Sequence, residues 1–248
     1  MDHVQPVPFP GPGVARPATL QVGADRFRVA PWQGHRDVAL LGPGRGSLLL
    51  SAPAIRTCLD DLGRVGVGRV FTPALTAVET GPFLNAGFRV HERLHLLSRD
   101  LYDLPDEEPC PTRPGRSWHR RQVLDADHAA FGPFWWFDQA SLHEARRATP
   151  SSRYRVAIRR GRVEGYAVTG RAGHRGYLQR LAVHPRAQGA GLGRGLVLDA
   201  FRWLARRGVT VVMVNTQEAN RRALELYEGI GFTRHPEGLL VLSYELRR

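Results

Sequence analysis

Hydrophobic positions in the second half of the chain recur with the periods of both helices and strands. The segment GLVLDAFRWLARRG (195–208) has apolar residues three or four positions apart, which predicts an amphipathic helix. Between 117 and 248 the pattern predicts strands at 120–124, 154–159, 163–169, 176–183, 209–214, 232–235 and 239–246, and helices near 125–131, 138–147, 193–207 and 219–229. This order predicts a mixed α/β (α+β) sandwich with helices on both faces of a mixed sheet.

The two halves of the chain end in similar patterns. Residues 66–101 and 208–246 each contain a Gly-Val, a strand-like run, a helical stretch, a Gly-Phe and a closing strand, which reads LHLLSRDL or LLVLSYEL. A helical stretch precedes each copy, at 51–66 and 195–208. Matches in the same order predict an internal duplication. The first copy has fewer residues upstream, so we interpret it as a shortened, degraded repeat.

The segment 102–116 is rich in proline and acidic residues and has no hydrophobic periodicity, which is typical of a linker. It divides the chain into domains at 18–101 and 117–248. Residues 1–17 contain five prolines and predict a flexible arm, without the basic and apolar regions of a secretory signal. No apolar run approaches the length of a transmembrane helix, so we expect no membrane association.

Composition and charge limit the classes of partner and cofactor that the chain is expected to bind. The two cysteines, Cys58 and Cys110, lack the spacing of a disulfide framework or a metal site, which favours a reducing, cytoplasmic compartment and no metal. The net charge is +12, all 35 basic residues are arginines, and the excess lies after residue 110. No nucleic-acid-binding motif accompanies this charge, so we interpret it as dispersed surface arginine, which argues against a nucleic acid partner. A homodimer is compatible with the sequence.

The segment QGAGLGRG (188–195) lies between a predicted strand and a predicted helix. Its glycine spacing departs from the dinucleotide-binding fingerprint, and a chain without lysine has no Walker A motif. Glycines before a helix let backbone N–H groups converge on an anion, and the helix dipole adds positive potential. The loop therefore predicts a phosphate or pyrophosphate site; the alternative is a tight turn that binds nothing.

LAVHPRAQGAGLGRGLV (181–197) resembles motif A of the GCN5-related N-acetyltransferase (GNAT) superfamily through Gln188, Gly191 and Gly193. NTQEANRRALELYEGIGF (215–232) resembles its motif B through Asn220, Ala223, Tyr227 and the pair Gly231-Phe232. The resemblance covers 117–248 as a complete GNAT domain and extends weakly to 50–101. It implies a GNAT fold in the second domain, preceded by a shortened GNAT-like domain.

The resemblance implies acetyl-coenzyme A as cosubstrate and a primary amine as acceptor, either a small molecule or a protein N-terminus. It implies that the pantetheine arm pairs with the strand backbone, that the glycine loop holds the pyrophosphate, and that Tyr227 acts as general acid to the leaving thiolate. The residues implied to bind the cosubstrate are Leu181, Ala182, Val183, Gln188, Gly189, Ala190, Gly191, Leu192, Gly193, Arg194, Asn220 and Tyr227. Without the motif, Tyr227 would be interpreted as a packed aromatic and Asn220 as a helix cap.

The general base is not identified. Family members often have a glutamate on the strand before motif A, where this chain has Gln179 and Arg180. Glu164 is the first candidate, followed by Glu218, Asp138 and His184. Trp135 and Trp136 lie where acceptor-binding helices are expected, although a core or interface role explains them equally well. A missing base also suits a non-catalytic acyl-coenzyme A-binding or regulatory protein, which is the alternative function.

The first repeat does not read as a second active site. Aligning its Gly-Phe pair with that of motif B places Phe83 opposite Tyr227 and Thr76 opposite Asn220. Phenylalanine offers no hydroxyl, and no glycine loop like QGAGLG precedes the helix at 51–66. We expect this repeat to have a structural role.

Overall fold

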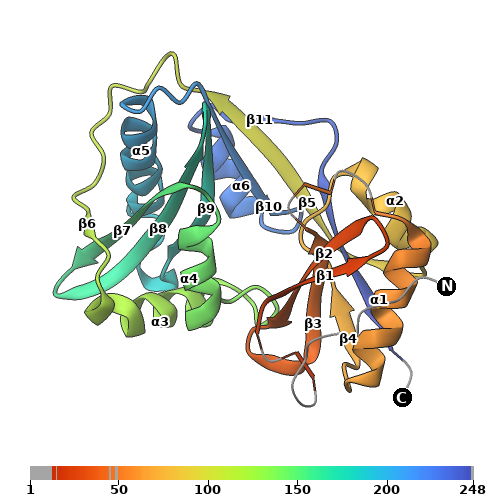
Figure 1. Ribbon diagram of the computed structural model, residues 1–248. Helices are drawn as coiled ribbons and strands as arrows, with labels where there is room; N and C mark the ends of the chain where they lie inside the picture. Colours follow the sequence, from red (N-terminus) through yellow and green to blue (C-terminus); the bar gives the residue numbers. More distant parts are fainter. Residues whose placement is uncertain (1–12, 15, 45, 48–49, 247–248) are drawn as a thin grey trace. The chain divides into compact units, whose positions relative to one another are not determined.

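The computed structural model describes residues 13–14, 16–44, 46–47 and 50–246 of the chain. These residues form two compact units. The first unit combines the residues up to His95 with those from Pro236 onward, and the second unit runs from Leu96 to His235. Each unit contains β-strands and helices (Figure 1).

The second unit has a mixed sheet with strand order β6-β7-β8-β9-β10-β5, and β11 also pairs with β5. Its elements are the second half of β5 (Arg89–Asp100), β6 (Arg113–Pro114), η1 (Ser117–His119), α3 (Arg120–Ala130), α4 (Gln139–Arg147), β7 (Ser151–Arg159), β8 (Arg162–Ala172), β9 (Arg175–Val183), η2 (Pro185–Ala187), α5 (Leu192–Ala205), β10 (Val211–Gln217), α6 (Arg221–Glu228) and β11 (Thr233–Arg234). β9 and β10 are parallel and β7, β8 and β9 are antiparallel neighbours.

Helices cover both faces of this sheet, as the sequence predicted. Tyr166 and Val168 of β8 pack in one core cluster with residues of α3 and α4. Their neighbour Ala167 packs in another cluster with Leu192 and Leu196 of α5. Successive strand residues point to opposite faces, so α3 and α4 lie on one face and α5 on the other. α6 joins the face of α5, because Leu224 and Phe201 belong to the same cluster.

The first unit has strand order β1-β2-β3-β4-β12-β5 and no equivalents of α3 and α4 among its described residues. Its elements are β1 (Ala18–Val22), β2 (Asp25–Trp32), β3 (His35–Pro43), α1 (Ala52–Arg64), β4 (Arg69–Phe71), α2 (Ala77–Asn85), the first half of β5 and β12 (Leu239–Glu245). β3 and β4 run parallel and are connected through α1, as β9 and β10 are connected through α5. This matching order agrees with the predicted duplication.

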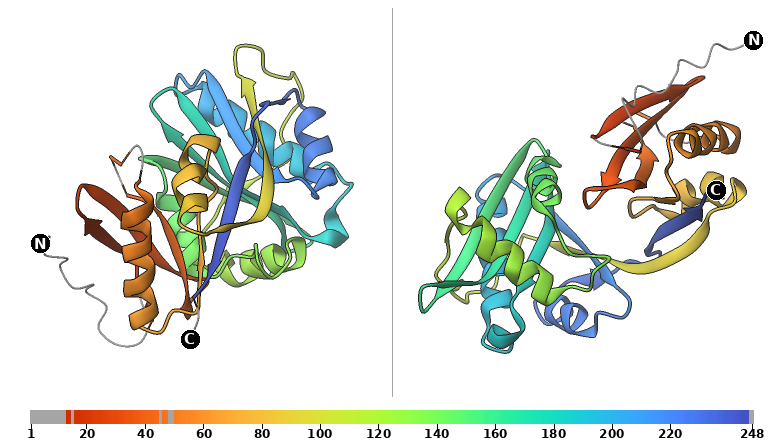
Figure 2. Two further views of the ribbon diagram at one scale, coloured as in Figure 1. Left: turned by 90° about the vertical axis from the view of Figure 1, so that its right-hand side faces the viewer. Right: turned by 90° about the horizontal axis from the view of Figure 1, so that it is seen from below.

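The two closing strands exchange places between the units. β12, the closing strand of the second copy, pairs antiparallel with β4 and with the first half of β5. The second half of β5, the closing strand of the first copy, pairs with β11 and neighbours β10. Each sheet is therefore completed by the other copy's last strand, and the units divide the chain within β5 and after His235 rather than at the predicted 101 and 117. The first half of β5 lies in one unit and the second half in the other (Figure 2).

The strand predicted at 120–124 is wrong, because these residues form the start of α3. Val123, Ala126 and Asp127 are its buried residues, and their spacing is helical once Asp127 is counted as a core position. The edge strand of this sheet is the short β6, which lies within the segment predicted as a linker.

The segment 102–116 is an ordered strap that packs on α5. Glu107 accepts hydrogen bonds from Arg194, and Thr112 donates to Asp199 at 3.2 Å. Cys110 lies so close to α5 that a Cβ on Gly195 would lie 2.6 Å from its backbone nitrogen. The strap therefore belongs to the second unit, and Figure 1 shows it running beside α5.

Residues 1–12 and 15 of the predicted arm at 1–17 lie outside the described residues. Val14, near the end of that range, is fully buried in the core of the first unit. Val14 is therefore a core residue, whereas the sequence predicted a flexible arm at this position. Among the described residues, no helix combines the length and apolar character that crossing a membrane requires.

Candidate functional site

The site begins where β9 and β10 separate. Their pairing covers only Arg175–Tyr177 opposite Val211–Met213, whereas β9 stays paired with β8 as far as Val183. In the described part of the chain, the edge of β9 from residue 178 to 183 therefore has no strand on the side of β10. Unpaired backbone groups at a strand edge can receive an extended ligand as an added strand.

A bulge in β9 sets which side chains flank this edge. The register shifts so that Val168 pairs with Arg180 and Thr169 with Leu178, which leaves Gln179 without a partner in the ladder. Leu178 packs among residues of α5, whereas Arg180 reaches Asp127 of α3 on the opposite face. The bulge thus turns the Arg180 side chain away from the cavity described below.

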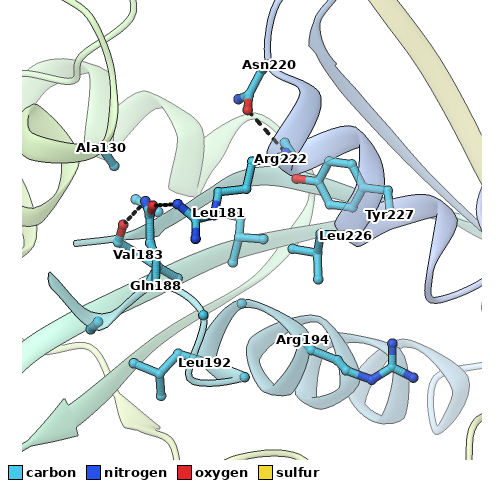
Figure 3. A pocket seen from close by; sticks show the side chains of 16 residues that line it. Ala130, Leu181, Val183, Gln188, Leu192, Arg194, Asn220, Arg222, Leu226 and Tyr227 are labelled. Atoms are coloured by element: carbon cyan, nitrogen blue, oxygen red, sulfur yellow. Dashed lines mark hydrogen bonds between the residues drawn. The ribbon is translucent and has the colours of Figure 1, made fainter. Parts of the chain in front are cut away.

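A cavity of about 250 Å³ lies beside the free edge. Its lining includes every residue predicted to bind the cosubstrate except Ala190 (Figure 3). Its lining residues are Ala130, Leu181, Ala182, Val183, Ala187, Gln188, Gly189, Gly191, Leu192, Gly193, Arg194, Asn220, Arg222, Ala223, Leu226 and Tyr227. Five lining positions were not assigned to the cosubstrate from the sequence, although Ala223 was recognised as a motif B residue: Ala130, Ala187, Arg222, Ala223 and Leu226.

The glycine loop leaves the start of α5 open. Gly189 and Gly191 have φ values of +80° and +76°, in the left-handed region that favours glycine. Gly191 is the N-cap of α5, and no side chain caps this helix. The first N–H groups of the 14-residue helix α5 thus have no side-chain acceptor at its N-terminus. Such a terminus attracts anions through these donors and the helix dipole.

Two amides fix the rim of the cavity. Gln188 donates to the carbonyl of Val183 at 2.8 Å, and its side-chain oxygen accepts from Arg222 at 2.5 Å. Asn220 is the N-cap of α6, where its side-chain oxygen accepts from the N–H of Ala223 at 3.1 Å. Figure 3 shows that the two bonds of Gln188 connect the end of β9 with α6, whereas the bond of Asn220 lies within the start of α6.

Tyr227 lies on α6 with its ring packed against Phe232 and only 5% of its surface exposed. Its hydroxyl points toward the centre of the lining residues (Figure 3). Burial raises the pKa of Tyr227 well above its ordinary value, and the positive charge of Arg180 lowers that pKa only in part. The hydroxyl is therefore protonated at neutral pH and is available as a hydrogen-bond donor.

The structure does not bring the base candidates into the cavity. The carboxylate of Glu164 pairs with Arg186 at 2.9 Å, and His184 accepts from the backbone of Arg186. Asp138 caps α4, and Glu218 precedes α6. The lining contains no aspartate, glutamate or histidine. Trp135 and Trp136 are also absent from it.

A buried ion pair holds the aromatic segment between α3 and α4. Asp127 is fully buried and forms a two-pronged pair with Arg180, with both distances 2.7 Å. Asp127 also accepts from the Tyr166 hydroxyl and the Phe137 N–H. The Arg180 guanidinium lies 3.6 Å and 3.9 Å from the ring centres of Phe131 and Phe137. The sequence offered no signal for this network beyond the unusual arginine on a buried strand.

The first unit closes the corresponding helix terminus with its own carboxylate. Asp25 accepts from the backbone N–H of Ser51 at 3.0 Å and from its hydroxyl at 2.7 Å. Ser51 is the N-cap of α1 and accepts from the N–H of Ala54. Phe83 is fully buried in α2, at the position that Tyr227 has in α6. A carboxylate and a capping hydroxyl thus lie where the second unit has its open glycine loop. Among the described residues, no group of three or more His, Cys, Asp and Glu side chains could hold a metal ion.

Comparisons with known proteins agree with this geometry. Residues 112–232 match the model of the acetyltransferase (GNAT) family. The mycothiol acetyltransferase of Acidothermus cellulolyticus is 30% identical over 220 residues, which are 78% of this chain and 65% of that protein. The enzyme of the same name from Thermomonospora curvata is 40% identical over 109 residues, which are 44% of this chain and 33% of that one. The chain thus spans from a third to just under two thirds of these relatives.

Solved structures share the fold. A tandem GNAT protein from the clavulanic acid biosynthesis pathway has a TM-score of 0.64 at 13% identity, covering 94% of this chain and 85% of that one. A GCN5-related N-acetyltransferase from Sphaerobacter thermophilus has a TM-score of 0.59 at 19% identity, covering 92% and 83%. The separated parallel strands and the family match show that residues 112–232 belong to the acetyltransferase (GNAT) family, and the chain as a whole shares its fold with a tandem GNAT protein.

Proposed function

We propose that the second unit is an acetyl-coenzyme A-dependent N-acetyltransferase that acts on a primary amine. The observation that carries this proposal is the unpaired edge of β9 next to the uncapped start of α5, which together form one cavity. The relatives named mycothiol acetyltransferase favour a small-molecule amine over a protein N-terminus as acceptor.

The residues present fit this cosubstrate. The free backbone of β9 suits the amide groups of a pantetheine arm, and the N–H groups of the loop at 189–193 suit a pyrophosphate. Asn220 holds the start of α6, which carries Tyr227. When bound, acetyl-coenzyme A supplies an acetyl group activated as a thioester, which the amine attacks directly. Tyr227 donates a hydrogen bond to the sulfur as negative charge develops there.

The chain's own residues supply no general base within the cavity, because the lining lacks carboxylates and imidazoles. An aliphatic amine attacks only in its neutral form, and its ordinary pKa is about 10.4 for a lysine-like amine. We infer that the amine reaches the cavity neutral or loses its proton to water. This matches the unassigned base of the sequence interpretation and replaces Glu164 in that role.

The test measures thiol release from acetyl-coenzyme A with a panel of small primary amines and N-terminal peptides, and identifies the acetylated product by mass. We expect Tyr227→Phe to lower kcat by about 10²- to 10³-fold, the effect of losing one hydrogen-bond donor to a developing anion. Its affinity for coenzyme A should change by less than about 3-fold, because the pyrophosphate contacts remain. Tyr102→Phe is the matched control, because Tyr102 is 81% exposed and outside the cavity.

The alternative function gives a different result. A protein that binds coenzyme A, yet releases no thiol above background with any acceptor, would be an acyl-coenzyme A-binding or regulatory protein. An active enzyme whose kcat survives Tyr227→Phe would retain the proposed reaction and remove Tyr227 from the mechanism.

A further inference from the structure

We propose that Arg222 of α6 is the cation that recognises the pyrophosphate of coenzyme A, and that Arg194 of α5 is not. This inference rests on the proposed function, because it assigns a recognition residue to the same cavity. It departs from the sequence interpretation, which counted Arg194 and not Arg222 among the residues that bind the cosubstrate.

Arg222 and Arg194 are the two charged residues that line the cavity. Both lie close to the glycine loop, from α6 and α5 respectively. A pyrophosphate carries negative charge, so each arginine is a candidate to pair with it. The other contacts of each arginine show which guanidinium is already paired with a carboxylate.

Arg194 is already neutralised. Its guanidinium forms a two-pronged pair with the Glu107 carboxylate, at 2.6 Å and 2.5 Å, and also donates to the carbonyl of Gly229 at 3.0 Å. The same pair lowers the pKa of Glu107 and raises that of Arg194. Figure 3 shows the Arg194 side chain directed along α5 and away from the glycine loop. A phosphate would have to displace Glu107 to reach it.

Arg222 has a neutral partner. Its guanidinium donates to the amide oxygen of Gln188 at 2.5 Å, and no carboxylate pairs with it among the described residues. Figure 3 shows the side chain reaching from α6 across the lining residues to Gln188, beside the glycine loop. Exchanging an amide oxygen for a phosphate oxygen replaces a neutral acceptor with a charged one, which strengthens the hydrogen bond.

Gln188 thereby has a definite task. Its NH₂ group is held by the Val183 carbonyl, so its oxygen faces Arg222 and not the strand. This arrangement extends the flexible arginine over the cavity before any ligand binds. Preorganisation of this kind lowers the entropy lost on binding.

The experiment compares the affinities of coenzyme A and pantetheine for full-length variants by calorimetry. We expect Arg222→Gln to weaken coenzyme A binding by about 10- to 100-fold, the usual effect of losing a charge-assisted hydrogen bond. The variant should leave pantetheine binding within about 3-fold, because pantetheine lacks the pyrophosphate. Arg222→Lys, which keeps the charge and loses the planar fork, should give an intermediate loss.

Two variants provide the comparison. Arg221→Gln removes the neighbouring exposed arginine of α6, which does not line the cavity, and should weaken coenzyme A binding by less than about 3-fold. Arg194→Gln should weaken it less than Arg222→Gln does. The inference is overturned if Arg222→Gln binds coenzyme A like the wild type, or if Arg194→Gln causes the larger loss. A wild-type protein that binds no coenzyme A would overturn the proposed function as well.

Discussion

Replacing the fully buried Asp127 should destabilise the second unit. Asp127→Ala removes the acceptor of four hydrogen bonds, two of them from Arg180. Arg180 is 8% exposed, and its remaining hydrogen-bond acceptor is the Trp135 carbonyl. A buried charge that loses its partner destabilises a protein by about 3–5 kcal/mol. At roughly 2–4 °C per kcal/mol for a chain of this size, the melting temperature should fall by about 6–20 °C.

The assays are thermal unfolding, which gives the melting temperature, and guanidinium unfolding, which gives the free energy; both are monitored by tryptophan fluorescence. Four of the five tryptophans lie between Leu96 and His235, so the signal reports mainly on the second unit. Glu228→Gln is the control, because its pair with Arg234 is 40% to 47% exposed and should contribute less than about 1 kcal/mol. Asp127→Ala combined with Arg180→Met should recover part of the loss, because no unpaired charge remains buried. An Asp127→Ala protein within about 1 kcal/mol of the wild type would show that Asp127 does not neutralise a costly buried charge.

Three further predictions concern the reaction, the strap and the first unit. Burial raises the pKa of Tyr227, so its hydroxyl stays protonated as the pH rises and kcat/KM should increase until it levels off at the pKa of the acceptor amine. pH–rate profiles with two amines of different pKa check this. The same inflection pH for both amines would contradict it. Gly195→Val places a side chain against Cys110, so we expect the free energy of unfolding to fall by about 1–3 kcal/mol and proteolysis within 102–116 to become faster. An unchanged rate of cleavage would contradict the packing of the strap on α5. Asp25→Ala should lower the stability of α1 by about 0.5–2 kcal/mol, measured by chemical unfolding. The variant should not gain a second coenzyme A site. A second site would show that the Asp25 carboxylate alone prevents binding in the first unit.

The sequence predicted most of the second unit and most of the candidate site. Local signals were sufficient there, because hydrophobic periodicity defines α5 and the glycine loop lies directly before it. The motif residues of α6 line the same cavity as the loop, as the resemblance implied. The prediction of a strand at 120–124 was wrong for a local reason. α3 buries Asp127, a charged residue that a hydrophobic pattern does not identify as a core position.

What the sequence did not predict depends on contacts between distant residues. LHLLSRDL and LLVLSYEL are both good strands, and nothing in either stretch says which sheet it completes. The sequence of 102–116 is typical of a linker, because the segment is held by side-chain hydrogen bonds, the two-residue strand β6 and the close approach of Cys110 to Gly195. None of these contacts leaves a periodic hydrophobic pattern. Arg194 and Arg222 look alike in sequence. The structure distinguishes them, because Arg194 pairs with the Glu107 carboxylate, whereas Arg222 bonds to the neutral Gln188 and has no carboxylate partner among the described residues.

The central claim is that one cavity, in the second unit alone, holds coenzyme A. Calorimetric titration of acetyl-coenzyme A into the full-length protein tests it directly, because the binding stoichiometry counts the sites. One molecule should bind per chain, because the second unit leaves the start of α5 open and the first unit caps α1 with Ser51 and Asp25. Two molecules per chain, or none, would contradict it.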